Sequence, residues 1–364
     1  MPTQLNNASI DAILSQIKPE IRQMGGYITP PQGDVPAKLN QNENPFDFPQ
    51  SWKEEIFQTM QSISWTRYPA NGAPEIRALL AKRFNLTPDQ VMLGNGSNQL
   101  LYTIVLAIIG SGDTLLMTPP SFSLFSEVAT LYQANLVQVQ LNSDFSLNEE
   151  EVLKAAKDAK LILLCSPNNP TGNEIPISFL ETLLGSTSGI VMWDEAYAEF
   201  SEQSATGLID QYPNLIISRT FSKAFGLAGL RIGYFLGNAR LIAELQKANL
   251  PYNLNLFSEQ VCKTLLSNDA WVQKHVQLIK DERETLYQNM LALKGVTVYP
   301  SQANFLLCKV DNGPVVIKAL QNSGILVRNM GAYPLLENHF RVTIGKPEEN
   351  ALFLESMKQI LMSN

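Results

Sequence analysis

The middle of this 364-residue chain alternates short apolar runs with amphipathic stretches, a pattern that restricts the fold more than any other feature. Short apolar runs are typical of buried strands, and apolar residues every three or four positions are typical of helices. We expect strands at 114–118, 135–140, 160–165, 189–195 and 214–218. We expect helices at 75–84, 98–109, 123–132 and 177–184. Such alternation predicts an α/β fold with a mostly parallel sheet that helices cover on both faces.

The pattern changes after about residue 250, where a long helical stretch is followed by short apolar runs and two further helices. Single cores stop growing near about 250–300 residues, so a chain of this length has room for two domains. We expect an N-terminal arm and loop that partly joins the small domain (1–45), a large domain with a mostly parallel mixed sheet (46–250) and a smaller α+β domain (251–364).

Composition argues against several classes of protein. The formal net charge of −7 and the lack of any run of Lys or Arg argue against a nucleic-acid partner. The longest apolar runs are far shorter than the roughly 20 residues that a membrane-spanning helix needs, and the N-terminus does not resemble a signal peptide. The three cysteines form no CxxC motif, so we expect no disulfide framework, no metal site and a cytoplasmic location. With only two histidines, acid–base chemistry is expected to use other groups.

Polar side chains follow the predicted strands where they end, which is where ligands collect in open α/β sheets. Asn169 lies in the turn "SPNNPTG" after one strand. Asp194 ends the next strand, and Tyr197 follows it by three residues. A buried carboxylate without a partner costs several kcal/mol, so Asp194 either needs a cation or is an exposed residue that caps the next helix.

The segment "SRTFSKAFGLAGLR" (218–231) follows a third strand and contains a single lysine, Lys223. Thr220, Ser222 and Arg231 offer hydroxyl donors and a fixed cation, which suit a phosphate. Apolar surroundings disfavour an ammonium, so the pKa of Lys223 should fall toward the range where its amine is a nucleophile and base. The alternative is a surface lysine in a glycine-containing loop.

Two further segments add candidates. "LGNGSNQLL" (93–101) runs from a strand into a helix, where Ser97 suits an N-cap and the N–H groups of Ser97 and Asn98 form an anion site. Phe122 could stack on a planar ring or belong to the core. Pyridoxal 5'-phosphate (PLP) uses all these groups at once. Its aldehyde would react with Lys223 and its ring nitrogen would face Asp194. Its ring oxygen would accept from Asn169 and Tyr197, and its phosphate would be held by Arg231, Ser222, Thr220, Ser97 and Asn98.

The motifs that carry these residues are similar to those of the fold-type I, aspartate aminotransferase-like PLP enzymes over essentially the whole chain. Within that family the chain looks most like the histidinol-phosphate aminotransferases. The matching segments are "NENP" (42–45), "RYP" (67–69), "GNGSNQ" (94–99), "SPNNPTG" (166–172), "DEAYAEF" (194–200), "SRTFSKAFGLAGLRIGY" (218–234), "ILVRN" (325–329) and "FRVTIG" (340–345). The family commonly has "GADE" where this chain has "GSNQ", which leaves any side-chain role of Asn98 open.

The resemblance implies further roles. Arg341 would bind a substrate carboxylate, and Tyr68 would reach the cofactor phosphate of a neighbouring subunit, which implies a homodimer with shared active sites. Tyr27 and Arg328 would hold a substrate phosphate, and Asn44 would lie with the substrate.

The resemblance also implies a reaction. The expected reaction is transamination of L-histidinol phosphate and 2-oxoglutarate to imidazole acetol phosphate and L-glutamate. The alternatives are an aromatic amino-acid aminotransferase, a phosphothreonine decarboxylase of cobalamin synthesis and a non-catalytic regulator.

Overall fold

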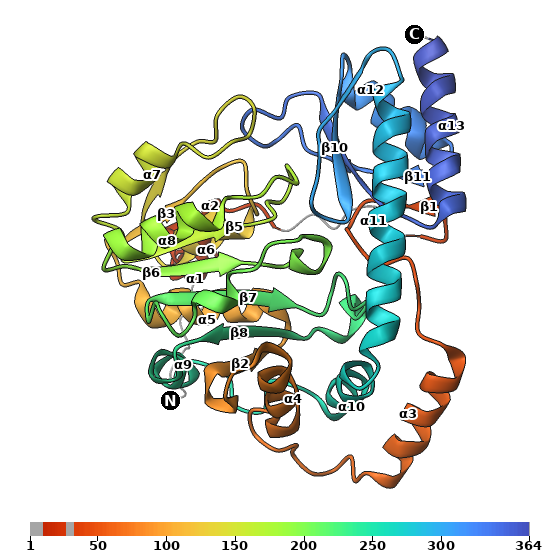
Figure 1. The fold of residues 1–364 in the computed structure, drawn as a ribbon. Coiled ribbons are helices and arrows are strands. Elements are labelled where there is room, and N and C mark those ends of the chain that lie inside the picture. The colour runs from red at the N-terminus through yellow and green to blue at the C-terminus, as the bar shows by residue number, and fades with distance from the viewer. Residues whose placement is uncertain (1–9, 27–32, 364) are drawn as a thin grey trace, which may run out of the picture.

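The computed structural model describes residues 10–26 and 33–363 and contains a seven-stranded and a four-stranded sheet (Figure 1). The larger sheet has the strand order β2-β8-β7-β6-β5-β3-β4. Its strands are β2 (Val91–Gly94), β3 (Thr114–Met117), β4 (Asn135–Gln138), β5 (Leu161–Cys165), β6 (Ile190–Asp194), β7 (Leu215–Thr220) and β8 (Gly233–Gly237). Neighbours from β4 to β7 run parallel, whereas β8 runs antiparallel to both β7 and β2. The sheet is therefore mixed and mostly parallel.

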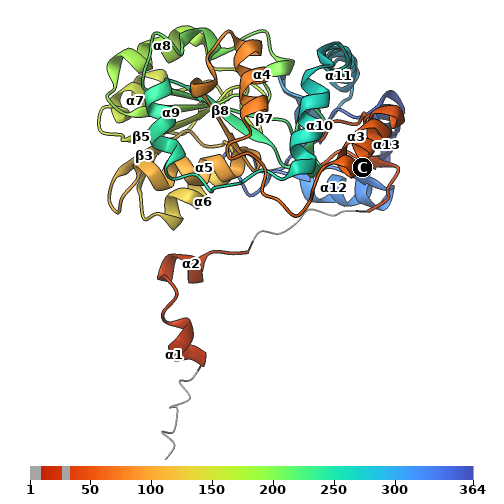
Figure 2. The same ribbon diagram turned by 90° about the horizontal axis from the view of Figure 1, so that it is seen from below.

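Alternate residues of the central strands enter two separate cores, because successive side chains of a strand point to opposite faces. In β5, Leu161 and Leu163 pack in one core and Ile162 and Leu164 in the other. One face is covered by α5 (Gly96–Ile108), α6 (Leu124–Leu131) and α9 (Ala239–Gln246). The other is covered by α4 (Pro74–Phe84), α7 (Glu149–Ala155) and α8 (Ile177–Ser186). Figure 2 shows α5 and α6 on the side of the sheet opposite α7 and α8.

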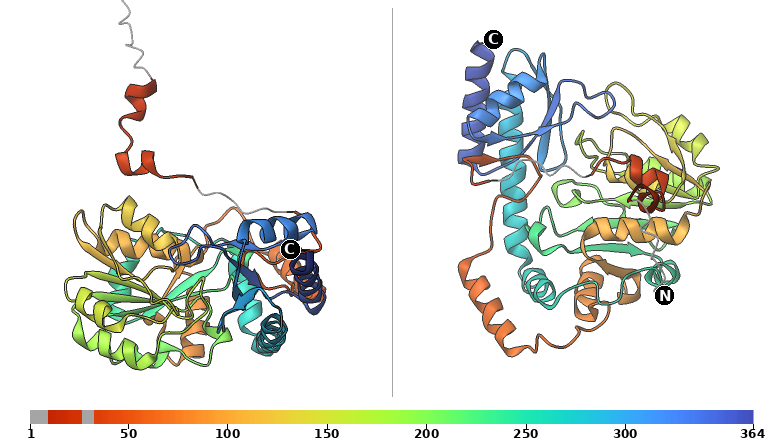
Figure 3. Two further views of the ribbon diagram at one scale, coloured as in Figure 1. Left: turned by 90° about the horizontal axis from the view of Figure 1, so that it is seen from above. Right: turned by 180° about the vertical axis from the view of Figure 1, so that it is seen from behind.

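The smaller sheet is antiparallel, with strand order β12-β13-β10-β9. Its strands are β9 (Val296–Val298), β10 (Phe305–Val310), β12 (Arg328–Asn329) and β13 (His339–Thr343). Next to it lie α11 (Asp269–Leu291), α12 (Gly313–Asn322) and α13 (Pro347–Ser363), seen from behind in Figure 3. The parallel pair β1 (Ala37–Lys38) and β11 (Ile325–Leu326) joins the N-terminal loop to this part of the molecule.

The remaining helices connect or extend these layers. Helix α3 (Gln50–Ser62) packs on α10 (Leu256–Leu266), and Figure 2 shows α1 (Ile10–Leu14) and α2 (Pro19–Gln23) projecting from the body. Short 3-10 turns are η1 (Pro88–Gln90), η2 (Ala198–Phe200), η3 (Ala205–Leu208) and η4 (Ala228–Leu230). Within the described ranges, no helix has both the length and the apolar character needed to cross a lipid bilayer.

The expected α/β class and mostly parallel mixed sheet are confirmed, with two differences of detail. The helical stretch after residue 250 is two helices, because α10 ends at Leu266 and α11 begins only at Asp269. Strand β8, which begins and ends with a glycine, was not expected from the sequence. It lies between β7 and the edge strand β2. The domain boundaries at 45/46 and 250/251 stay a prediction.

Candidate active site

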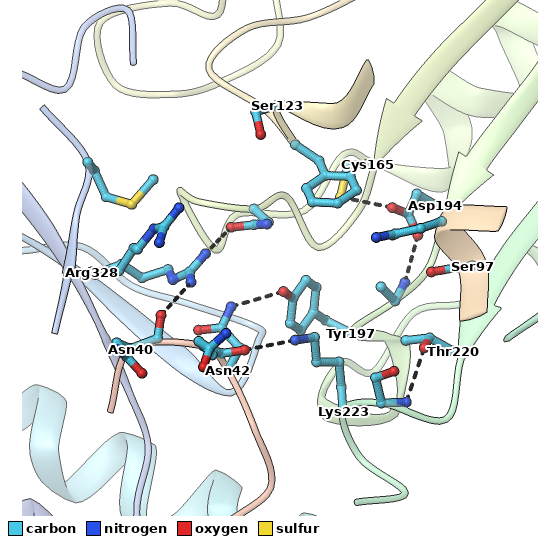
Figure 4. A pocket seen from close by; sticks show the side chains of 18 of the residues that line it. Asn40, Asn42, Ser97, Ser123, Cys165, Asp194, Tyr197, Thr220, Lys223 and Arg328 are labelled. Atoms are coloured by element: carbon cyan, nitrogen blue, oxygen red, sulfur yellow. Dashed lines mark hydrogen bonds between the residues drawn. The ribbon is translucent and has the colours of Figure 1, made fainter. Parts of the chain in front are cut away.

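A pocket of about 420 Å³ lies where the carboxyl ends of the parallel strands face the four-stranded sheet (Figure 4). All but two of the candidate residues that the structure describes line it, although they come from segments far apart in the chain. Those in the lining are Ser97, Asn98, Phe122, Asn169, Asp194, Tyr197, Thr220, Ser222, Lys223, Arg231, Arg328 and Arg341. Residues that follow different strands in the sequence thus lie together in one site.

The ends of β5, β6 and β7 lie level with one another. Cys165 pairs in register with Asp194, and Asp194 pairs with Ser218. Because parallel strands end at the same edge, Asp194 and the segment after β7 enter the same pocket. The backbone at the ends of β6 and β7 is also joined by the hydrogen bond from Glu195 N–H to Ser218 C=O, at 2.8 Å.

A buried ion-pair network lies beneath this edge. The guanidinium of Arg219 donates to Glu195 and, at 2.9 Å, to Glu199, and it lies over the ring of Phe84. All three charged side chains are at most 7% exposed. Because Arg219 immediately precedes Thr220 and Glu195 immediately follows Asp194, the network fixes the backbone that carries two pocket residues.

Asp194 is taken out of water without a cation beside it. Its Oδ1 accepts the N–H of Ala196 at 3.1 Å, and the Cys165 thiol lies 4.0 Å from its Oδ2. Burial raises the pKa of Asp194 to about 7, and the charge of Glu195 adds to the rise. Among the described residues no lysine or arginine forms a salt bridge with Asp194, so the carboxylate would be stabilised by a cationic group placed in the pocket.

Lys223 projects its amine into the same pocket, where Nζ donates to the carbonyl of Gln41 at 2.9 Å (Figure 4). Burial, and then the positive charge of Arg341, lower the pKa of Lys223 to about 7. A substantial fraction of this amine is therefore neutral near pH 7, which is the form that acts as a nucleophile or base. The alternative of an ordinary surface lysine does not agree with this position.

An anion site forms between the start of α5 and Arg231. Helix α5 begins at Gly96 with Asn95 as its N-cap, so Ser97 is the second helical residue and not the N-cap that the sequence suggested. The N–H groups of Ser97 and Asn98 still belong to the first turn, where they have no partner within the helix. Arg231 completes the site, and its guanidinium donates to the Ser222 hydroxyl at 3.3 Å.

Two glycines permit this close approach. Gly96 has φ +78°, and a Cβ at this position would lie 2.7 Å from the guanidinium of Arg231. A Cβ at Gly233 would lie 2.2 Å from the backbone nitrogen of Ser97. Any side chain at either position would displace the helix start or Arg231, so both glycines are needed for the anion site.

Two donors face the pocket opposite Asp194. The side-chain oxygen of Asn169 accepts from the guanidinium of Arg341, and because a guanidinium only donates, the NH₂ group of Asn169 is left to face the pocket. The hydroxyl of Tyr197 accepts from Asn42 at 2.9 Å. Burial raises the pKa of Tyr197 to about 12, so this phenol keeps its proton. Phe122 also lines the pocket and meets Phe125 edge to face, with 5.7 Å between the ring centroids.

Two arginines form the cationic wall nearest the smaller sheet. Arg328 and Arg341 are direct cross-strand partners on β12 and β13. Arg341 is 8% exposed, donates to the carbonyl of Asn40 at 3.2 Å and lies over the ring of Phe305. Two adjacent guanidinium groups in a pocket suit an anionic ligand.

Two described candidates, Tyr68 and Asn44, are not among the residues that line this pocket. Tyr68 is 81% exposed and stacks on Tyr252 with ring centroids 4.6 Å apart, at a separate groove. Asn44 lines a second pocket and donates to the carbonyl of Ala224 at 2.9 Å, and its contact with substrate stays a prediction. Tyr27 lies outside the described residues.

The sequence interpretation missed several lining residues. Asn40, Gln41 and Asn42 enter the pocket from the loop after β1. Cys165, Ser123, Met330 and Tyr333 also line it. The motif "NENP", which begins at Asn42, located this loop, but nothing in its local pattern indicates a position next to strands more than a hundred residues away.

The pocket residues fit PLP. The anion site lies at one end, the buried Asp194 carboxylate suits a protonated ring nitrogen, and the Lys223 amine is available for the aldehyde. Asn169 and Tyr197 can both donate to a ring oxygen, since their other hydrogen-bonding positions are taken by Arg341 and Asn42. Gly96 and Gly233 leave room for the phosphate-binding groups.

Comparison with known sequences gives one family. The sequence profile of the family described as "Aminotransferase class I and II" matches residues 36–357. The chain is 39% identical over 347 residues to a protein of Chlorobaculum tepidum named histidinol-phosphate aminotransferase. That match covers 94% of this chain and 100% of the relative, so the likeness extends over both sequences.

Solved structures share the fold. Histidinol-phosphate aminotransferase from Sinorhizobium meliloti, in complex with pyridoxal-5'-phosphate, has a TM-score of 0.86 and 23% identity, covering 96% of this chain and 98% of that one. L-threonine-O-3-phosphate decarboxylase from Porphyromonas gingivalis has a TM-score of 0.79 and 23% identity, covering 90% and 99%. Because an aminotransferase and a decarboxylase share this architecture, the fold alone does not select the reaction.

The lowered pKa of Lys223 leads to a test on protein without bound cofactor. Reagents that modify neutral amines should label Lys223 with a half-maximal rate near pH 7, because the amine gains a proton below that pH. Arg341→Met should move the midpoint upward, since it removes a positive charge, and Arg240→Met on α9 is the control outside the pocket. Peptide mass spectrometry across a pH series measures the labelling. A midpoint unchanged by Arg341→Met would contradict the electrostatic account.

Proposed function

The chain belongs to the aminotransferase class I and II family, and from that premise we propose that it transfers the amino group of L-histidinol phosphate to 2-oxoglutarate with PLP as cofactor. The observation that carries the proposal is the position of Lys223 and Asp194, which follow adjacent strands into a single pocket that also holds an anion site. The products would be imidazole acetol phosphate and L-glutamate.

When bound, PLP supplies an aldehyde that takes up the amino group and a protonated ring that withdraws electrons from the reacting carbon. Asp194 would hold the proton on the ring nitrogen, because a buried carboxylate favours a cationic partner. Tyr197 and Asn169 would donate to the ring oxygen. The backbone of Ser97 and Asn98, with Ser222 and Arg231, would hold the phosphate.

Lys223 would carry the proton between the substrate carbon and the cofactor. Its position in the pocket and its lowered pKa support this role, because a neutral amine near pH 7 can accept a proton and later return it. Tyr197 lies close by, with Nζ of Lys223 6.0 Å from the centre of its ring.

The charge of the two arginines supports the choice of substrates. Arg328 and Arg341 are neighbours and together carry two positive charges. L-Glutamate offers two carboxylates, and L-histidinol phosphate offers one phosphate of up to two negative charges, so either ligand can neutralise the pair. This explains how one pocket could accept both amino donors in turn. The aromatic aminotransferase and the phosphothreonine decarboxylase are not favoured, since the extended sequence match is to histidinol-phosphate aminotransferases.

The reaction type is tested by the amine at position 223. Lys223→Ala should lose measurable turnover and the visible absorption of cofactor bound through that amine, while the folded protein remains. In the wild type, adding L-glutamate should change the cofactor's visible absorption spectrum. Absorption that glutamate leaves unchanged, together with carbon dioxide released from O-phosphothreonine, would instead identify a decarboxylase.

Substrate choice is tested at Arg328. Arg328→Ala should lower kcat/KM for L-histidinol phosphate by about 10- to 100-fold, the effect of losing a charged hydrogen bond. The loss for L-phenylalanine, which carries one carboxylate and no phosphate, should be smaller. Lys309→Ala is the matched control, because this exposed cation lies on β10 of the same sheet and does not line the pocket. Equal losses for both amino donors at Arg328 would contradict phosphate recognition.

We also propose that two copies of the chain form a homodimer whose active sites are shared. Large apolar side chains are exposed at the groove that contains Tyr68: Trp65 (72%) and Tyr252 (46%) line it, and Phe57 (61%) packs on Phe257 of its lining. A second copy would cover them. Tyr68 does not line the pocket of its own chain, which agrees with a contact to the cofactor phosphate of the partner.

Hybrid dimers test the shared site. A Lys223→Ala chain mixed with a Tyr68→Ala chain would place both defects in one site and leave the other site intact. Random exchange between the two inactive parents should therefore restore about a quarter of wild-type activity, given two-fold symmetry. Native mass spectrometry confirms that exchange has occurred, because the hybrid has a mass between those of the two parent dimers. Exchanged hybrids that remain inactive would contradict a shared site.

A cytoplasmic location is proposed on the state of the cysteines. Cys165, Cys262 and Cys308 are all buried free thiols, as is usual in a reducing compartment. Cell fractionation that recovers the protein elsewhere would contradict this location.

A further inference from the structure

Asn42 is held in the loop after β1 by contacts to the smaller sheet. It is 1% exposed and has a left-handed backbone with φ +55°. Its N–H donates to the hydroxyl of Thr343 at 2.9 Å, and its carbonyl accepts from the side chain of Asn304 at 3.1 Å. The position of the residue is thus fixed before its side chain is considered.

The orientation of the Asn42 amide follows from the same contacts. The Thr343 hydroxyl already accepts the N–H of Asn42, so its own proton is available to donate, and Oδ1 of Asn42 lies 3.1 Å away to accept it. The oxygen of the amide therefore faces Thr343. The NH₂ group faces Tyr197 and donates to its hydroxyl at 2.9 Å (Figure 4).

This donor determines where the hydroxyl proton of Tyr197 can point. An NH₂ group cannot accept, so the phenol cannot return its proton to Asn42. The Tyr197 ring also packs against the ring of Phe305 at 84°, with the ring centroids 5.3 Å apart. An aromatic ring, and not a polar acceptor, therefore lies on that side of Tyr197. Tyr197 lines the pocket, and the pocket is the direction in which its proton can find an acceptor.

We propose that Asn42 is a positioning residue, which makes the Tyr197 hydroxyl a permanent donor to the ring oxygen of bound PLP. The inference rests on the proposed function, because it needs the cofactor in this pocket. The inference gives a role to a residue of the N-terminal loop. Thr343 and Asn304 hold Asn42, and Asn42 in turn orients the Tyr197 hydroxyl at the edge of the larger sheet.

The effect is measurable as a pH titration of the cofactor's visible absorption. A donor to the ring oxygen stabilises the unprotonated chromophore, so loss of that donor should raise its apparent pKa by about one pH unit. The charged and titratable groups that face Tyr197 are Arg341 from β13, Cys165 from β5, Asp194 from β6 and Lys223. These groups are unchanged in every variant that follows, so a shift in the apparent pKa of the chromophore reports the Tyr197 hydroxyl.

The main variant is Asn42→Gly, because glycine adopts the left-handed backbone without strain and removes only the amide. Asn85→Gly is the matched control, since Asn85 also has a left-handed φ, +57°, but lies at the end of α4. Thr343→Val is a second variant that keeps Asn42 and removes the hydroxyl that orients it. Tyr197→Phe gives the full loss of the donor. Thermal melting checks that each protein is folded.

We expect the apparent pKa to rise in Asn42→Gly and Tyr197→Phe, to rise less in Thr343→Val and to stay unchanged in Asn85→Gly. Adding Asn42→Gly to Tyr197→Phe should give no further shift, because Asn42 acts through the hydroxyl. The inference is overturned, and the proposed function kept, if Tyr197→Phe shifts the titration but Asn42→Gly does not, or if Asn42→Gly shifts it equally without the hydroxyl. A Tyr197→Phe protein that titrates as wild type also overturns it. A wild type that gains no visible band with PLP overturns both.

Discussion

The carboxylate of Asp194 is buried at the end of β6 without a salt bridge to any described lysine or arginine, and the other polar groups of the pocket are arranged around it. Burial shifts the pKa of Asp194 and of Lys223 to about 7 from opposite directions. Neither group forms a salt bridge with another described residue, so both suit a ligand with a cationic nitrogen and an electrophilic carbon. The anion site at the start of α5 then determines which way such a ligand lies.

A second set of buried charges lies next to Asp194 in the sequence, and its members are paired with one another. Arg219 satisfies Glu195 and Glu199 just beneath the pocket, on the residues next to Thr220 and Asp194. Buried ion pairs contribute little net stability, but breaking one leaves an uncompensated charge that costs about 3–5 kcal/mol. The network therefore restricts the backbone beneath the pocket to one arrangement, while the side chains above it keep their hydrogen-bonding capacity for a ligand.

The sequence predicted the parts of this site that depend on local pattern. Lys223 and Asp194 could be found because each follows a strongly apolar run, and parallel strands bring such ends together. Asn42 could not be found in this way, since its contacts to Tyr197 and Thr343 cross 155 and 301 residues of chain. Asn44, two residues later in the same motif, donates to Ala224 and lines a second pocket. Motif membership located the loop, and only tertiary packing decided which of its amides enters the pocket.

The neutral residues at positions 97–99 have a physical explanation. Gln99 accepts the N–H of Asn95 at 2.7 Å through its side-chain oxygen, and its NH₂ group donates to Asn249 at 2.6 Å. A glutamate could accept from Asn95 as well, but it could not donate to Asn249, so this amide network matches a neutral side chain. Asn98 lines the pocket without a negative charge near Arg231. The start of α5 is thus held in place by amides alone, and the positive charge of Arg231 remains available in full for the phosphate of the proposed cofactor.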